Sequence, residues 1–337
     1  MKKVNRIFAF LLALLTLFCF VACGESGTPI VRDDVKREIC KIPTNEETLL
    51  ETVNACKRYE SSYLPDRRVE QIGTFCASDC AVVVRRLTFS EGKDTVTAYV
   101  ADVYIDNMTQ FYGYVCRDEN GKLSNKPAAD VIAETGALLL VNADYLSARR
   151  WGLYVRNGVK VRSGSTDGVD VCLIGKDGKM RTVNGDTFDT DAAMKDKNLC
   201  HIFSFGPSLL NADGTPRDED AQFHITDRYS KWNNYESTVG FPVPNPRTAF
   251  GQAEDGHFLF VTVDGRMKGF SRGVTFPELS HILYEEGAIV AYNMDGGGSE
   301  ILCFKGVEYT KQYSEDAKRI PSDYVVILSD NYQGETP

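Results

Sequence analysis

The 337-residue chain has fewer basic residues than acidic ones, 38 Lys and Arg against 47 Asp and Glu, and its formal net charge is −9. This shortage argues against nucleic acid as a partner, because phosphate backbones are bound through Lys and Arg. The sequence also lacks a Gly-x-Gly-x-x-Gly dinucleotide fingerprint, a Walker lysine motif and an EF-hand loop. Hydrophobic residues make up 43% of the chain, so it can still bury a sizeable core.

Clusters of metal-ligating residues are scarce as well. Cys76 and Cys80 have a spacing that occurs in zinc sites, but no second Cys/His pair of matching spacing follows, and a structural zinc site needs four ligands. We therefore predict no metal and no cofactor. The chain has four histidines, and these are His201, His224, His257 and His281.

The N-terminus carries the longest apolar run, residues 7–22, directly after a start that contains three basic residues. This pattern is typical of a secretory signal, and the run is too short to span a bilayer comfortably. We predict a signal peptide over residues 1–22, with an uncleaved signal anchor as the alternative. Its removal takes away three positive charges and no negative charge, so the net charge changes from −9 to −12.

Cys23 follows Ala22 in an arrangement that resembles a bacterial lipobox, although Phe20 stands where Leu is usual. The resemblance implies that Cys23 is lipidated and becomes the first residue of the mature protein. The predicted location is therefore the outer face of the cell membrane, through the lipid, or the secreted fraction. The lipid, rather than basic attraction, would hold the acidic protein to the membrane.

Ten cysteines are present. Cys19 leaves with the signal peptide and Cys23 carries the lipid, which leaves an even number in an exported chain and favours disulfides of unknown connectivity. The remaining eight are Cys40, Cys56, Cys76, Cys80, Cys116, Cys172, Cys200 and Cys303.

The rest of the chain predicts one α+β domain, a mixed and largely antiparallel sheet with packed helices, over residues 66–337. Residues 23–65 are a predicted tether with a short helix, for which Thr44 and Glu47 have capping-box spacing. From about residue 80, runs rich in Val, Tyr and Thr predict strands. The dipeptide Asn157-Gly158 between apolar runs predicts a hairpin.

Three further segments shape the expected fold. Residues 127–146 predict a helix that stops at Gly136 and then a buried strand. Residues 275–287 predict an amphipathic helix that buries apolar side chains at helical spacing. Residues 288–299 predict a strand that opens into a glycine loop, with residues 300–309 as its partner strand.

Polar and glycine residues follow several apolar strands, and strand ends are common places for pockets. The stretch AYNMDGGGSE, residues 291–300, is the most constrained of these. Three consecutive glycines bare successive backbone amides, which suits an anionic or hydroxyl-rich ligand. Arg247 is the candidate for binding a phosphate through its planar guanidinium.

Five elements in this order resemble the phosphodiester glycosidase family, the bacterial relatives of N-acetylglucosamine-1-phosphodiester α-N-acetylglucosaminidase. They are VNADY (141–145), GPSLLNADG (206–214), NPRTAFG (245–251), VDGRMKGFSRG (263–273) and YNMDGGGSE (292–300). The resemblance covers roughly residues 95–330. The chain departs from the family at Ala143, where Gly is usual, and at Glu300, where a small or hydroxyl residue is common.

The resemblance implies a hydrolase that cleaves a sugar joined through C1 to a phosphodiester, releasing the sugar and leaving a phosphomonoester. The substrate would be a phosphoglycan or a cell-wall or capsular polymer. The implied catalytic residues are Asp295, Asp264 and Arg247. The implied substrate-binding residues are Asn142, Thr248, Arg266, Ser271, Gly296, Gly297, Gly298 and Ser299.

Several alternatives stay open at this point. Asp295 is the favoured essential carboxylate, acting on water or as a nucleophile, but it can instead order the loop by accepting amide hydrogen bonds. A histidine dyad with Ser271 or Ser299 is another arrangement. The alternative function is a catalytically silent, surface-anchored glycan-binding protein that retains the pocket.

Overall fold

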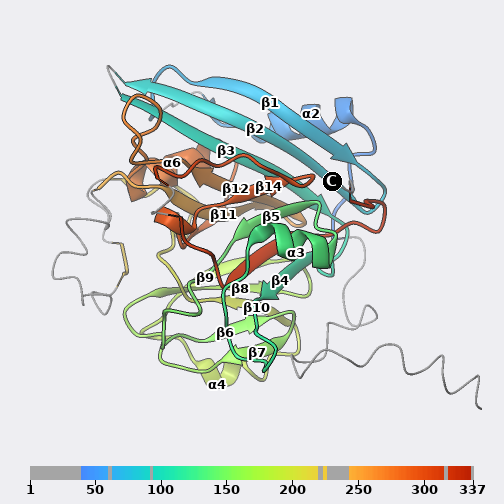
Figure 1. The fold of residues 1–337 in the computed structure, drawn as a ribbon, viewed down its shortest axis with the longest axis vertical. Coiled ribbons are helices and arrows are strands. Elements are labelled where there is room, and N and C mark those ends of the chain that lie inside the picture. Colours follow the sequence, from blue (N-terminus) through green and yellow to red (C-terminus); the bar gives the residue numbers. More distant parts are fainter. Residues whose placement is uncertain are drawn as a thin grey trace, which may run out of the picture.

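The computed structural model describes most of the chain beyond its N-terminal segment, and its strands there form three antiparallel sheets (Figure 1). The described residues are 39–59, 63–91, 94–218, 223–225, 243–314 and 318–334. The predicted α+β class with largely antiparallel pairing is therefore confirmed. The predicted signal peptide and Cys23 lie outside the described residues.

The first sheet has six strands in the order β1-β2-β3-β12-β11-β13. Their bounds are β1 Arg68–Cys76, β2 Cys80–Glu91, β3 Asp94–Ile105, β11 Arg247–Glu254, β12 His257–Val263 and β13 Val290–Met294. The second sheet has the order β7-β6-β10-β8-β9. Its strands are β6 Tyr154–Arg156, β7 Val159–Arg162, β8 Asp170–Gly175, β9 Met180–Asn184 and β10 Leu199–Phe203.

The third sheet has the order β15-β14-β5-β16-β4 and, in Figure 1, lies between the first sheet at the top and the second at the bottom. Its strands are β4 Phe111–Val115, β5 Leu139–Asn142, β14 Leu302–Phe304, β15 Val307–Glu308 and β16 Asp323–Ile327. The helices are α2 Glu46–Ala55, α3 Ala128–Thr135, α4 Thr190–Ala193, α6 Phe276–Glu285 and the 3₁₀ turn η4 Gly297–Ser299.

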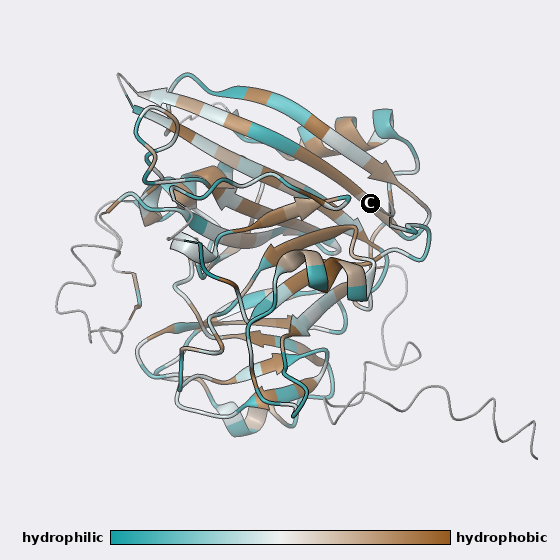
Figure 2. Cartoon of the chain, viewed as in Figure 1, coloured by the Kyte–Doolittle hydropathy of each residue, from teal (hydrophilic) through white to brown (hydrophobic). Residues whose placement is uncertain are grey.

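The hydrophobic core follows the two-residue period of the strands. In β2, Val82 and Val84 belong to the core that all three sheets share, while Ala81 and Val83 pack with α2. Helix α6 packs its apolar side chains against the first sheet, as its spacing predicted. Figure 2 shows hydrophobic residues concentrated along the strands and hydrophilic residues along many of the connecting loops.

The predicted short helix is present as α2, but its cap is one residue later than predicted. Asn45, not Thr44, is the N-cap, and its side chain accepts a hydrogen bond from the Thr48 amide at 2.9 Å. Asn at this position satisfies a helical N–H that would otherwise lack a partner. The predicted stop at Gly136 is confirmed, since this residue ends α3 with φ 66°.

The Asn157-Gly158 hairpin is confirmed, because both residues have positive φ and join β6 to β7. The pairing predicted for residues 300–309 is wrong. Strand β13 pairs with β11 in the first sheet, whereas β14 pairs with β5 in the third. The glycine loop therefore crosses from one sheet to another instead of turning back as a hairpin.

All eight cysteines after Cys23 are free thiols, so the predicted disulfides are not found. Five of them are buried, at Cys80, Cys116, Cys172, Cys200 and Cys303, where they pack as small hydrophobic side chains. Within the described ranges, none of the helices has the length and apolar character that a membrane crossing needs.

Candidate active site

The glycine loop, residues 295–299, connects β13 to β14 and is tied to the end of β5. The Asn142 side-chain amide donates a hydrogen bond to the Asp295 carbonyl oxygen at 2.5 Å. The Asp295 amide donates to the Ala143 carbonyl oxygen at 3.1 Å. Two predicted elements, VNADY and the glycine loop, are therefore in direct contact through residues 153 positions apart in the chain.

The loop also presses against the start of β11, and this contact explains its first glycine. A Cβ atom added to Gly296 would lie 2.5 Å from the Pro246 carbonyl oxygen and 3.1 Å from the Arg247 Cα. The Gly297 amide donates to the same Pro246 carbonyl at 3.0 Å, and Gly297 has φ 64°. The close approach to β11 therefore requires glycine at position 296, and the left-handed backbone conformation favours glycine at position 297.

Asp295 is the acidic residue of this loop, and as a whole residue it is partly buried. Burial raises its pKa to about 6, although hydrogen bonds from Ser299 and the Gly296 amide and the positive charges of Arg149 and Arg319 act in the opposite direction. A carboxylate whose pKa is raised by burial beside charged partners is typical of catalytic acids and bases. The same hydrogen bonds also order the loop, so the geometry is compatible with both roles that the sequence left open.

Arg266 is an exposed cation beside the glycine loop. Its guanidinium lies 3.8 Å from the position that a Cβ atom of Gly297 would take. The guanidinium is oriented by Asn245, whose Oδ1 accepts from Nε at 3.0 Å and from Nη2 at 2.7 Å, and by the Tyr313 hydroxyl at 3.0 Å from Nη1. A fixed and accessible guanidinium suits recognition of a phosphate.

Two further arginines act on the loop and were missed from the sequence. Arg149 is buried and donates to the Ser204 carbonyl oxygen at 2.9 Å, while Arg319 is exposed and its amide donates to the Gly298 carbonyl oxygen at 2.8 Å. Both stabilise the charged form of Asp295. Arg149 follows the VNADY element by four residues, but Arg319 lies outside every recognised motif and only the fold reveals it.

Arg247 and Thr248 occupy the strand on which the loop rests. The Arg247 side chain is buried, donates to the carbonyl oxygens of Val274 at 3.2 Å and Val243 at 3.1 Å, and lies over the Phe276 ring at 4.1 Å. The Thr248 side chain is also buried. Arg247 thus touches the loop through its backbone, while its guanidinium binds backbone carbonyls on the α6 side.

Asp264 and Ser271 are buried behind the loop. Asp264 Oδ1 accepts from the Lys311 amide at 2.8 Å, and burial raises the pKa of this carboxyl to about 6. Ser271 is the centre of a Gly-x-Ser-x-Gly string, residues 269–273, but its hydroxyl donates to the Asp264 carbonyl oxygen and accepts from the Thr97 amide at 3.0 Å. These two hydrogen bonds join the Ser271 side chain to the backbone of Asp264 and Thr97.

The histidine–serine dyad finds no support in the described contacts, because each histidine ring has another partner. The pairs are His201 with the Phe111 carbonyl oxygen, His224 with Asp170 and Asp186, His257 with Asp102, and His281 with Asp218. Carboxylates and a carbonyl thus engage all four rings.

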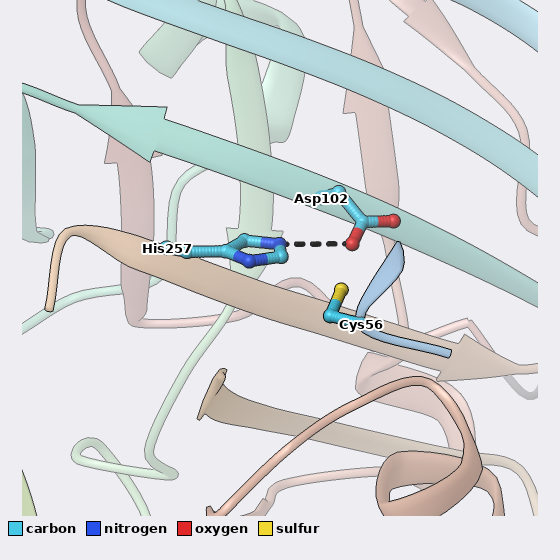
Figure 3. Close-up of side chains that lie close together, drawn as sticks. All are labelled: Cys56, Asp102 and His257. Carbon is cyan, nitrogen blue, oxygen red and sulfur yellow. Dashed lines mark hydrogen bonds and ion pairs between the residues drawn. The ribbon is translucent and has the colours of Figure 1, made fainter. Parts of the chain in front are cut away.

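In the described part of the chain, Cys56, Asp102 and His257 form a group whose ligand atoms lie within 4.8 Å of one another (Figure 3). His257 Nε2 is 2.9 Å from Asp102 Oδ1. However, the same carboxylate already binds Lys57 at 2.8 Å and Arg85 at 2.6 Å. Two adjacent cations oppose a third positive charge, so the group is an ion-pair network beneath α2 and a poor metal site.

The comparisons with known proteins agree with this arrangement of elements. The sequence model of the phosphodiester glycosidase family matches residues 135–327, which is more than half of the chain. The chain belongs to the phosphodiester glycosidase family. This family acts on sugar phosphodiesters, and the glycine loop and the strand that supports it both lie inside the matched region.

The SPbeta prophage-derived uncharacterized protein YomE of Bacillus subtilis is 26% identical over 233 residues, which is 68% of this chain and 32% of that protein. The chain thus spans about a third of the length of this curated relative. The zebrafish N-acetylglucosamine-1-phosphodiester α-N-acetylglucosaminidase catalytic domain, auto-inhibited by its pro-peptide, matches with a TM-score of 0.60 at 16% identity, over 88% of this chain and 97% of that one.

A hypothetical protein from Synechocystis matches with a TM-score of 0.52 at 11% identity, over 80% of this chain and 64% of that one. At such identities both structural likenesses establish the fold alone. They confirm that the three sheets make one domain of the phosphodiester glycosidase type.

Proposed function

We propose that this protein is a hydrolase that cleaves a sugar-1-phosphodiester, releasing the sugar and leaving a phosphomonoester. The observation that supports it best is the placement of Asp295, a partly buried residue whose carboxyl has a raised pKa, on a loop bordered by Arg266 and Arg319. Cleavage of a C1–O–P linkage needs a carboxylate that stabilises the positive charge developing on the sugar. It also needs cations that stabilise the negative charge of the leaving phosphate.

In this proposal Arg266 binds the phosphate, because its guanidinium is accessible and held in place. Arg319 adds positive charge near Asp295, and the glycine amides supply donors. Asp295 is the essential carboxylate, ionised above about pH 6, which activates water or attacks C1. A phosphomonoester is a good leaving group, so the reaction depends little on a general acid.

We further propose that the protein acts outside the cell, anchored through Cys23 or secreted, on a phosphoglycan or on a cell-wall or capsular polymer. The basic start and apolar run of residues 1–22 support export. An accessible site that binds phosphate through arginine side chains fits a polymer with repeated phosphodiesters.

The test is sugar release by the purified full-length chain from an N-acetylglucosamine-1-phosphodiester and a panel of other sugar-1-phosphodiesters. We expect release of free sugar and an equal amount of phosphomonoester. The control is Lys179→Ala, an exposed residue of the loop that precedes β9, which should retain full activity. If no substrate of the panel is cleaved while glycans bind measurably, the protein is the silent glycan-binding alternative.

A further inference from the structure

Two buried carboxyl groups face each other behind the glycine loop. Asp264 directly follows β12, and Glu300 directly follows η4. Asp264 is 0% exposed and Glu300 is 1% exposed. Their side chains lie within hydrogen-bonding reach of each other.

Three of the four carboxyl oxygens of this pair accept no hydrogen bond from the described residues. Asp264 Oδ1 accepts from the Lys311 amide at 2.8 Å. Asp264 Oδ2 and both Glu300 carboxyl oxygens have no donor among the residues that the structure describes. Two ionised carboxylates within hydrogen-bonding reach would repel each other in a poorly hydrated environment, whereas one proton between them removes the repulsion and pairs two of these three oxygens.

The surrounding charges do not neutralise two anions. Burial and the Asp264 charge raise the pKa of Glu300 well above its usual range, and Glu308 raises it further. Arg266 lowers this pKa but does not offset the increase. Lys311 favours the ionised form of Asp264, and Glu308 opposes it. Tyr99, a further titratable group close to both carboxyls, contributes no positive charge. Of the two carboxyls, Glu300 therefore holds the proton.

We propose that Glu300 is a positioning residue of the candidate site, a neutral carboxylic acid near neutral pH whose O–H donates a hydrogen bond to Asp264 Oδ2. This hydrogen bond fastens the end of β12 to the end of the glycine loop. Asp264 lies two residues before Arg266, and Glu300 follows Ser299, which hydrogen-bonds Asp295. The pair thus fixes the position of the phosphate-binding arginine relative to the essential carboxylate. This effect on catalysis rests on the proposed function.

The first test needs no substrate. Infrared difference spectra of the full-length chain at pH 8 should show a neutral carboxylic acid that is lost in Glu300→Gln and retained in Glu308→Gln, a nearby exposed glutamate. The equilibrium constant for unfolding of the wild type should rise about tenfold per pH unit relative to Glu300→Gln between about pH 6.5 and 8, because the wild-type fold holds one extra proton. Identical spectra, or parallel stability curves, overturn the proposal.

The second test uses the reaction. Glu300→Gln keeps a donor for Asp264, so kcat should stay within about threefold of the wild type, whereas Glu300→Ala, without a donor, should lose about tenfold or more. Equal rates for all three proteins overturn the positioning role. If the wild type cleaves nothing on the panel, the proposed function fails, and the spectra still decide whether Glu300 carries the proton. If Glu300→Ala does not fold, Glu300→Gln and the spectra remain decisive.

Discussion

The side-chain oxygen of Asn142 accepts a hydrogen bond from the Thr248 hydroxyl at 2.8 Å, so that the ends of β5 and β11 are joined through two buried side chains. The same oxygen accepts from the Ile301 amide at 3.0 Å, and the amide group donates to the carbonyl oxygen of Asp295. One asparagine therefore connects two sheets and both ends of the glycine loop. The family resemblance implied that Asn142 and Thr248 bind substrate, whereas the hydrogen bonds that they make in the structure support the glycine loop.

Asn142→Ala should therefore reduce both stability and turnover. The substitution leaves a buried hydroxyl and two backbone groups without their partner, at a cost of about 1–3 kcal/mol for each group that stays unsatisfied. We expect a lower denaturation midpoint and at least a tenfold fall in kcat for sugar release. Thr248→Val, which removes one of the three contacts, is the graded comparison. Unchanged kcat in Asn142→Ala would show that the loop does not need this support.

Gly296→Ala tests the close approach of the loop to β11. The new methyl group would lie 2.5 Å from the Pro246 carbonyl oxygen, so the loop must move away from the strand. Gly297→Ala is the matched control, because its φ of 64° costs about 1–3 kcal/mol in strain but its Cβ meets only the Arg266 guanidinium at 3.8 Å. We expect sugar release to be lost in Gly296→Ala and retained in part in Gly297→Ala. The reverse order would contradict the packing argument.

Much of the fold followed from local signals. Asn157-Gly158 and Gly136 adopt positive φ, which these residue types favour. The α6 segment has apolar residues at helical spacing. In both cases residues close together in the sequence determine the local conformation. The pairing of β14 did not follow, because the residues that it pairs with in β5 are 161 to 165 positions earlier and either pairing satisfies the local pattern. Sheet partners are chosen by packing across the shared core, which a single sequence does not display.

The same distinction applies to the site. Asp295 and Arg266 could be found from the sequence because they belong to short motifs beside glycine. The Asp264–Glu300 contact could not be found in this way, because it joins chain segments 36 residues apart. Arg319 could not be found either, because it is placed by an isolated backbone hydrogen bond from its amide to the Gly298 carbonyl oxygen. Sequence also does not distinguish an arginine that faces solvent, such as Arg266, from one that binds backbone carbonyls, such as Arg247.

Arg266→Ala should weaken substrate binding more than it weakens the fold. Charge-assisted hydrogen bonds contribute about 1.5–3 kcal/mol, which corresponds to a rise in KM of roughly 10- to 100-fold. Arg266→Lys should recover part of this loss, because it keeps the charge without the planar pair of donors. Steady-state kinetics on the cleaved phosphodiester measures both. An unchanged KM and kcat in Arg266→Ala would remove this residue from the phosphate site.

Cys23→Ser tests the membrane anchor. A thioether-linked lipid needs the cysteine sulfur, so the serine variant should move from the membrane fraction to the soluble exported fraction. Fractionation of cells that produce either protein, followed by immunodetection, measures the distribution. Cys40→Ser, at a cysteine after the predicted cleavage site, serves as the control and should stay with the membrane. Retention of Cys23→Ser in the membrane would favour the uncleaved signal anchor.

Asp295→Asn separates the two roles of the carboxylate. Burial raises its pKa in the folded protein from 3.8 to about 6. The stability that the protonated carboxyl contributes is therefore complete below about pH 4 and is lost as the pH rises through 6. The asparagine variant does not ionise, so we expect it to be more stable than the wild type above pH 6, by up to about 3 kcal/mol, and equal to it below pH 4.

The same variant should have no measurable sugar release if Asp295 is the essential carboxylate, because asparagine neither activates water nor attacks C1. Loss of activity together with higher stability at pH 7 is the expected combination, since catalytic carboxylates are retained at a cost in stability. Loss of activity with lower stability would instead assign Asp295 to ordering the loop, through the Gly296 and Ser299 hydrogen bonds. Unfolding curves at pH 4 and pH 7, measured beside the sugar-release assay, distinguish the two.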